Sequence, residues 1–128
     1  MSAPPIEMVL LKQVASYLAM PIFVVDAEGA LEYYNEPAED LLGRRYEEAG
    51  QLPLDLWGRM WTPTDSGGEP LPPDRLPLAI AVRERRPSQE TLWIQGSDGV
   101  TRRIMITAIP INGRTSELIG ALAIFWES

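Results

Sequence analysis

The first apolar pattern along the chain has the period of a helix. Two sets of apolar residues between positions 6 and 18 recur at steps of three or four: Ile6, Leu10, Val14 and Tyr17 in one, and Met8, Leu11, Ala15 and Leu18 in the other. This spacing predicts a helix that ends before Pro21, since proline disfavours helix in the residue preceding it. A helix apolar over so much of its circumference has to be covered on more than one side.

Two short β-rich runs follow, at residues 22–25 and 30–34. Asp26-Ala-Glu-Gly29 lies between them and predicts a hairpin connection, with Gly29 at positive φ and Asp26 as a turn acceptor. Asn35 precedes Glu36-Pro37 and predicts the N-cap of a short helix. Ala38, Leu41 and Leu42 are its expected buried face, and Gly43 is its expected end.

The middle of the chain is less periodic. Residues 46–61 suit one or two short helical turns, and residues 62–70 predict a loop because Pro, Gly, Ser, Thr and Asp dominate them. Pro72-Pro73-Asp74 is expected to open a further helix that Pro87 closes. Within this helix, Leu76, Ala79, Ile80 and Arg83 follow helical spacing.

The last forty residues predict three strands, at residues 89–95, 100–109 and 117–126. Ser97-Asp98-Gly99 and Asn112-Gly113 are the expected hairpin turns between them. Successive antiparallel strands with such short links are expected to be neighbours in one sheet.

Side chains on a strand alternate between the two faces of its sheet. One predicted face consists of Phe23, Val25, Leu92, Ile94, Ile104, Ile106, Ala108, Ala121, Ala123 and Phe125, and the other carries Trp93, Met105, Leu122, Ile124 and Trp126. Both faces are largely apolar, whereas an antiparallel sheet commonly leaves one face polar. The central helices are expected to cover one face, and the N-terminal helix or a second subunit the other.

Composition narrows the classes of function. The chain has 128 residues, a net charge of −7 and neither Cys nor His. The length suits one domain, and the acidity argues against nucleic-acid binding, which cations drive by meeting phosphates. The missing residue types exclude a disulfide, a thiolate nucleophile, a zinc–cysteine site, a His-ligated metal and a Ser-His-Asp triad.

Two further absences shape the expectations. The longest apolar stretches, residues 19–25 and 118–126, are far shorter than the about 20 residues that cross a bilayer. The start of the chain lacks the features of a secretory signal, so we expect a cytoplasmic protein with no membrane partner. The carboxylates Glu36, Glu39, Asp40, Glu47 and Glu48 are interpreted as a solvated helix face, so no metal site is expected.

Four segments, taken in order, resemble the PAS family. Residues 24–43 are similar to the family's opening: an apolar strand, Asp-x-x-Gly, a second strand, Asn, a short helix and Leu-Gly. Asp65-Ser-Gly-Gly68-Glu-Pro70-Leu71-Pro72 is similar to its Asp-x-x-Gly-x-Pro loop. Asp98-Gly99-Val-Thr-Arg102 and Ala108-Ile-Pro110 are similar to its last hairpin and middle strand. The resemblance covers residues 20–126, and its specificity lies in the order and spacing of the four pieces.

The resemblance implies an α+β fold, with a five-stranded antiparallel sheet and short helices on one face around a central pocket. It divides the chain into an N-terminal amphipathic helix at residues 1–19 and a PAS-like domain at residues 20–128. The helix would cover the other sheet face or form a dimer interface. The family's last strand often ends in Asp-Ile-Thr, whereas Glu127-Ser128 stands here, so the domain either acts alone or comes from a larger protein.

The resemblance also implies a sensory and signalling role without enzymatic activity. PAS sensors include haem, flavin and chromophore proteins. Without His, a His-ligated haem is excluded, and without Cys, the cysteinyl-flavin form of the LOV subgroup and a thioester-linked chromophore are excluded. The cofactor is otherwise unknown: a non-covalent flavin, another small organic ligand and a filled core all stay open.

The candidate ligand pocket combines the first sheet face with Tyr34, Ala38, Leu76 and Ile80 from the helical side. These side chains either pack together as an ordinary core or surround a small, mostly apolar ligand. Alanines at three sheet positions leave some room. Only the Tyr34 hydroxyl offers a polar side-chain anchor, whereas an enzyme would need a convergent polar cluster.

The candidate dimer interface comprises Ile6, Leu10, Val14, Tyr17, Trp93, Met105, Leu122, Ile124 and Trp126. Aromatic anchors dominate the binding energy of interfaces, although the N-terminal helix of the same chain is an alternative cover for the two tryptophans. Two functions remain: a dimeric PAS sensor with a small ligand and a signalling partner or output domain, and a ligand-free scaffold for dimerisation and protein interaction.

Overall fold

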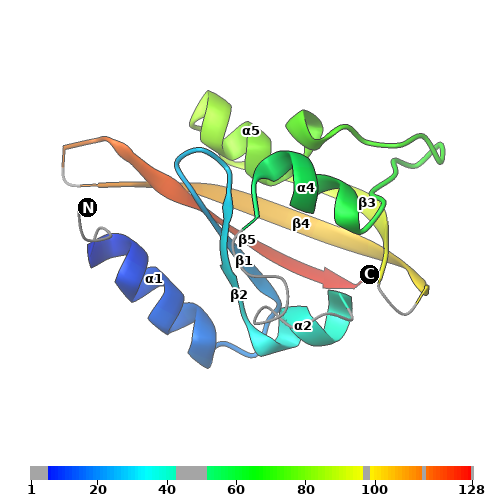
Figure 1. Ribbon diagram of the computed structural model, residues 1–128, viewed down its shortest axis with the longest axis horizontal. Helices are drawn as coiled ribbons and strands as arrows, with labels where there is room; N and C mark the ends of the chain where they lie inside the picture. The colour runs from blue at the N-terminus through cyan, green and yellow to red at the C-terminus, as the bar shows by residue number, and fades with distance from the viewer. Residues whose placement is uncertain (1–5, 43–51, 97–98, 114, 128) are drawn as a thin grey trace.

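The computed structural model describes residues 6–42, 52–96, 99–113 and 115–127, and the order of its elements is that of an α+β fold (Figure 1). The elements are α1 (Ile6–Tyr17), β1 (Ile22–Asp26), β2 (Leu31–Tyr34), α2 (Glu36–Leu42), α4 (Leu54–Met60), the 3-10 turn η1 (Pro73–Arg75), α5 (Pro77–Glu84), β3 (Ser88–Gln95), β4 (Thr101–Asn112) and β5 (Leu118–Glu127). All five strands expected from the hydrophobic pattern are present.

The five strands form one antiparallel sheet in the order β2-β1-β5-β4-β3. The predicted hairpin neighbours β1–β2, β3–β4 and β4–β5 are all paired. The central pairing joins β1 to β5, which places Phe23 opposite Ala123 and Val25 opposite Ala121. The first and last strands of the chain thus lie together in the middle of the sheet.

One face of the sheet carries the main core. Buried side chains of α2, α4 and α5 pack there against the face that contains Phe23, Leu92, Ile104 and Phe125. The predicted alternation along β3, β4 and β5 is confirmed, because Leu92 lies opposite Ile104, Ile106 opposite Phe125 and Ala108 opposite Ala123.

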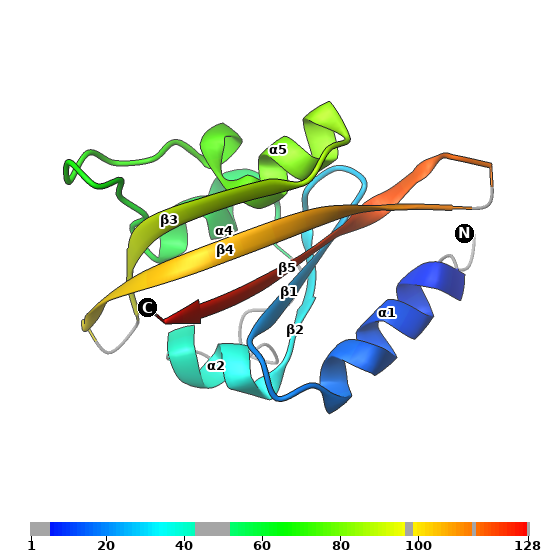
Figure 2. The ribbon, with the colours of Figure 1, turned by 180° about the vertical axis from the view of Figure 1, so that it is seen from behind.

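The other face of the sheet is covered in part by α1. Met8 and Ala15 are buried against Ile22, Val24 and Ile119. Figure 2 shows α1 beside β1 and β2, and on this side of the sheet no helix of the described residues lies over β3 and β4. The expectation that the N-terminal helix covers the second face therefore holds for one end of the sheet.

Turn chemistry explains the first hairpin. Asp26 Oδ1 accepts hydrogen bonds from the backbone N–H groups of Glu28 (2.9 Å) and Ala30 (3.0 Å). Gly29 has a φ of 87°, a conformation that glycine adopts without steric cost. Both predicted roles, Asp26 as acceptor and Gly29 at positive φ, are confirmed.

Two expectations about local structure are corrected. The helix expected from Pro72 is split, because Leu76 precedes Pro77 and is extended, with ψ 146°. The turn expected at Asn112-Gly113 lies further on, since β4 continues to Asn112 and Ser116 N–H donates to Gly113 O. The expected helix end at Gly43, the turn residues Ser97 and Asp98, and residues 46–51 lie outside the described ranges.

Candidate functional site

An apolar cavity of about 60 Å³ lies between the inner sheet face and the helices α4 and α5. Its walls come from four strands, from α4 and α5, and from the chain between these two helices. They comprise Phe23, Trp57, Gly58, Trp61, Pro63, Leu76, Pro77, Leu78, Leu92, Ile94, Ile104, Ile106, Ala123 and Phe125. No charged side chain is among them.

Two tryptophans form the helical wall. Trp57 in α4 and Trp61 at its C-cap are four residues apart, so they fall on one side of that helix. The indole N–H of Trp57 donates to the carbonyl of Gly29 at 2.8 Å, which fixes α4 against the β1–β2 turn. Gly58 lets α4 approach η1, since a Cβ there would lie 2.8 Å from Pro73 Cβ.

Aromatic packing surrounds the cavity. The ring of Phe23 lies edge-on to Trp57 and Trp61, at centroid distances of 5.6 Å in both cases, and stacks on Tyr34 at 5.1 Å. Such pairs contribute about 0.5–1.5 kcal/mol each beyond the burial of their area. The aromatic contacts with Phe23 therefore hold the two tryptophans of the α4 wall in place.

One polar atom in this wall has no partner. Trp61 is buried, and its Nε1 donates no hydrogen bond within the described structure. Its backbone carbonyl, in contrast, accepts a bond from Gln95 N–H at 2.7 Å and ties the end of α4 to β3.

The predicted pocket residues divide into two groups. Phe23, Leu76, Leu92, Ile94, Ile104, Ile106, Ala123 and Phe125 line the cavity. Val25, Tyr34, Ala38, Ala108 and Ala121 are buried in the same core but do not line it. Ile80 is half-buried on α5 and lies outside both groups. The Tyr34 hydroxyl is thus no anchor at this cavity.

Trp57 and Trp61 are not among the residues predicted for the pocket, because residues 46–61 have no clear period. Leu54, Trp57 and Trp61 follow Pro53 at steps of three and four, which is the spacing of one helical face. This spacing could have predicted the helix, but the helix has only seven residues and so shows less than two full turns of the pattern.

The candidate interface residues also divide into two groups. On α1, Ile6, Leu10, Val14 and Tyr17 are exposed, Tyr17 by 81%. On the outer sheet face, Trp93, Met105, Leu122, Ile124 and Trp126 are half-buried. Leu122 and Ile124 pack against the small core below α1, whereas Trp93 lies under the guanidinium of Arg103, 5.9 Å from its ring centroid.

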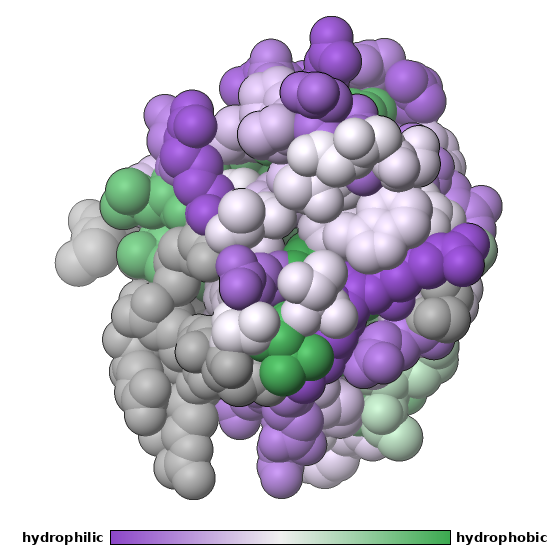
Figure 3. Space-filling view, turned by 90° about the vertical axis from the view of Figure 1, so that its right-hand side faces the viewer, coloured by the Kyte–Doolittle hydropathy of each residue, from purple (hydrophilic) through white to green (hydrophobic). Residues whose placement is uncertain are grey.

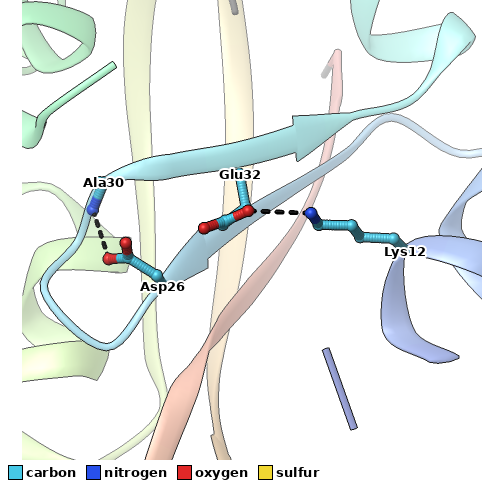
Figure 4. A network of polar contacts seen from close by, with 4 residues as sticks. All are labelled: Lys12, Asp26, Ala30 and Glu32. Carbon is cyan, nitrogen blue, oxygen red and sulfur yellow. Dashed lines mark hydrogen bonds and ion pairs between the residues drawn. The ribbon is translucent and has the colours of Figure 1, made fainter. Parts of the chain in front are cut away.

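Polar contacts hold α1 to the sheet. Asn35 is buried, and its Nδ2 donates to the carbonyls of Ala15 (2.9 Å) and Met20 (2.8 Å). Figure 4 shows Lys12 reaching from α1 to Glu32 on β2, where Nζ and Oε2 are 2.9 Å apart, beside the Asp26–Ala30 turn contact. The predicted cap is confirmed, since Asn35 Oδ1 accepts from Ala38 N–H at 3.2 Å.

Three features of the described residues outside the cavity bear on function. On the side drawn in Figure 3, hydrophobic areas are small and separated by hydrophilic ones. Within the described ranges, no three Asp or Glu side chains are grouped to hold a metal ion. Across those same residues, no helix has the length and apolarity needed to span a bilayer. Glu47 and Glu48 of the predicted carboxylate face lie outside them.

Comparison with known proteins gives a match in structure only. No protein-family model matches the sequence, and no curated protein matches it. The PAS domain of a protein from Colwellia psychrerythraea has a TM-score of 0.66 and 21% identity, over 95% of this chain and 97% of that chain.

Two further solved structures are similar. The Rhodobacter sphaeroides LOV protein has a TM-score of 0.72 and 17% identity, over 96% of this chain and 68% of that chain. The PAS domain of nitrogen regulation protein NR(II) from Vibrio parahaemolyticus has a TM-score of 0.62 and 15% identity, over 93% and 98%. At these identities the likeness concerns the fold.

Proposed function

We propose that this chain, whose fold is that of a PAS domain, senses a small, mostly apolar molecule in its core cavity and signals through the opposite sheet face. The observation that carries the proposal is the apolar cavity of about 60 Å³. Protein interiors are otherwise close-packed, and a cavity of this volume costs roughly 1.4 kcal/mol at about 24 cal/mol per Å³. A ligand that fills it recovers the missing contacts.

The size of the cavity limits the ligand. An engineered apolar cavity of about 150 Å³ binds benzene, so about 60 Å³ suits a molecule smaller than benzene. Pockets for drug-sized ligands measure about 300–1,000 Å³. A flavin or a haem is much larger than the ligand of this proposal.

The central strands supply a route from the cavity to α1. On β1, Phe23 lines the cavity while its neighbours Ile22 and Val24 belong to the small core below α1. On β5, Ala123 and Leu122 divide in the same way. A ligand that displaces either strand changes how α1 packs on the sheet. The size of the response depends on how much more tightly the ligand binds one packing arrangement of α1 than the other.

The signalling surface in this proposal is a homodimer interface. Ile6, Leu10, Val14 and Tyr17 form an exposed apolar stripe on α1, and the outer sheet face beyond α1 adds Trp93, Met105 and Trp126. Exposed apolar patches of this kind are typical of interaction sites. A partner protein or an output domain would receive the signal at the same surface.

A ligand-free scaffold is the second candidate, and the α1 stripe favours it. The stripe stands apart from the cavity, so it can serve an interface whether or not anything binds in the core. This reading assigns the cavity to imperfect packing.

Native mass spectrometry followed by denaturing extraction tests the proposal. A dimer that carries an extra mass supports the sensor and gives the size of its ligand. A dimer without extra mass, and without response to added small apolar molecules, favours the scaffold. A monomer under all conditions contradicts the interface in both readings.

A further inference from the structure

The cavity wall presents no hydrogen-bonding side chain to a molecule inside it. Its residues are aromatic, aliphatic, proline or glycine, and among them only the two indoles carry a polar side-chain atom. The indole N–H of Trp57 donates to Gly29 O at 2.8 Å. The Nε1 atom of Trp61 is itself buried, so neither indole N–H is open to the cavity.

The backbone of the wall is also closed to a ligand. On the helical side, the carbonyls of Trp61, Pro63 and Leu76 already accept hydrogen bonds, at 2.7, 2.9 and 3.0 Å. Pro63 and Pro77 have no N–H to donate. On the sheet side, the strands of the wall use their backbone groups to pair with one another. A molecule in the cavity therefore meets no donor or acceptor from these groups.

This lack of polar partners restricts the chemistry of the ligand. An ionised group would lose its hydration and meet no opposite charge, and a hydroxyl, amine, carbonyl or ether would lose hydrogen bonds to water without replacement. A water molecule is disfavoured for the same reason, because buried waters typically make about three hydrogen bonds. Only a molecule without polar groups enters the cavity without such a cost.

The volume of the cavity restricts the size of the ligand. A cavity of about 150 Å³ holds benzene, which corresponds to about 25 Å³ for each carbon atom. On that scale, the cavity of about 60 Å³ holds about two or three carbon atoms. Dispersion attraction grows with the number of atoms in contact, so a hydrocarbon that fills this space binds more tightly than a diatomic gas.

Ala123 is the wall position that sets this volume. It is the only alanine among the described residues of the wall, and it lies in the middle of the sheet between Phe23 on β1 and Ala108 on β4. Gly58 is smaller but has no room for a side chain, because a Cβ there would lie 2.8 Å from Pro73 Cβ. Carbon atoms added at Ala123 would therefore occupy the cavity itself.

We infer that the ligand is a light hydrocarbon of about two or three carbon atoms, held by apolar contacts without a hydrogen bond, and that Ala123 sets the upper limit of its size. This inference rests on the proposed function, because it needs the cavity to be a binding site. It adds the chemical class of the ligand and names a specificity-determining residue.

A series of small probes tests the size of the ligand. NMR titration of a chain with ¹³C-labelled Ala, Ile and Leu methyl groups reports binding at the wall directly and suits weak affinities. Propane has the expected size, benzene is larger, and dioxygen is a smaller apolar molecule. We expect propane to shift the methyl signals of Ala123, Leu92 and Ile104, with an affinity above those of benzene and dioxygen.

Dimethyl ether tests the absence of a hydrogen bond, because it has the shape of propane and one acceptor oxygen. With no donor in the wall, the ratio of the two affinities should equal the ratio of their partition coefficients from water into a liquid alkane, within about twofold. An ether that binds about tenfold more tightly than this ratio allows would reveal a donor in the wall.

The variant Ala123→Val adds carbon atoms to the wall. We expect the affinity for propane to fall about tenfold or more, since the burial of each carbon atom is worth a factor of about four. Ala27→Val makes the same change at an exposed position of the β1–β2 turn and should leave the affinity unchanged. If Ala123→Val does not fold, Ala123→Gly supplies the opposite test, because it widens the cavity and should raise the butane-to-propane affinity ratio about fourfold.

The negative results separate the inference from the proposed function. The inference is wrong, while the cavity remains a binding site, if the ether exceeds its partition ratio, if benzene, dioxygen or xenon binds and propane does not, or if the Ala123 variants bind like the unaltered chain. If neither xenon nor any of the probes enters the chain, both the inference and the proposed ligand site are overturned.

Discussion

The side-chain amide of Asn35, directly after β2, donates a hydrogen bond of 2.9 Å to the backbone carbonyl of Ala15 in α1. The same side chain donates to Met20 O and accepts from the N–H groups of Ile22 and Ala38. One buried residue thus joins α1, β1 and α2 at the point where the N-terminal helix meets the sheet.

Asn35→Ala is therefore expected to destabilise the chain by about 2–4 kcal/mol, because it removes a helix cap and leaves buried donors and acceptors unpaired. Urea unfolding measures the loss. Asn112→Ala, at an exposed asparagine of β4, is the control and should change stability by less than about 0.5 kcal/mol. Equal effects of the two variants would contradict the role of Asn35.

Lys12→Met is expected to loosen α1 without unfolding the domain. The Lys12–Glu32 ion pair is partly exposed, and such pairs contribute about 0–1 kcal/mol and weaken with salt. Hydrogen exchange should speed up in α1 and stay slow in β4 and β5. The control Arg86→Met breaks the exposed Arg86–Glu84 pair and should leave α1 exchange unchanged.

Ala123→Leu is expected to fill the cavity that Ala123 lines. The stability change should stay within about 1 kcal/mol, whereas Ala121→Leu, on the same strand and face but away from the cavity, should cost about 1–3 kcal/mol through overpacking. Thermal unfolding compares the two. If both substitutions destabilise alike, the cavity is too small to accept side-chain atoms, and the sensor proposal weakens.

Val14→Asp is expected to give a folded monomer if the exposed α1 stripe forms the dimer interface. Val14 is 55% exposed, so the substitution should cost little in the isolated subunit. Sedimentation velocity and circular dichroism report mass and folding. The matched control Gln13→Asp adds the same charge at an exposed polar position of α1 and should preserve the dimer. If both variants dissociate the dimer, the added charge and not the loss of the Val14 contact is the cause.

Gly120→Ala is expected to disturb the contact between α1 and β5. A Cβ at Gly120 would collide with the carbonyl of Val25 and lie 2.9 Å from Met8 Cε. The carbonyl belongs to the backbone and has no room to move, so we expect a loss of about 2 kcal/mol or more, the usual scale of a buried clash. Denaturant unfolding measures the loss. Gly67→Ala is the tolerated control, because a Cβ there would lie at an ordinary contact distance of 3.4 Å from Asp65 Oδ1.

Much of the fold follows from local rules and was predictable. The period of two along β4 and β5 assigned Ile104, Ile106, Ala123 and Phe125 to one face, and their cross-strand pairs agree. The role of Asp26 in the turn was predictable because it depends on neighbouring residues: its carboxylate accepts hydrogen bonds from N–H groups two and four positions later.

The candidate site was only partly predictable. The alternation of side chains along the strands predicted the sheet side of the cavity. The helical side depends on Trp57 in α4 and Trp61 at its C-cap, and α4 is too short for its period to be clear in the sequence. Asn35 was predicted as a cap, yet its bonds to Ala15 and Met20 span 20 and 15 residues. Sequence spacing carries no information about such distant partners.

The sequence by itself determined which residues are apolar, where the chain turns, which strands are hairpin neighbours, and that chemistry based on Cys or His is excluded. These properties depend on local geometry and composition. Only the tertiary structure decided that β1 pairs with β5, that the Met8–Ala15 side of α1 is buried while the Val14–Tyr17 side is exposed, and that Trp61 is a buried residue of the cavity wall. Those outcomes depend on how well distant surfaces fit together, and packing of that kind is settled only when all the elements meet.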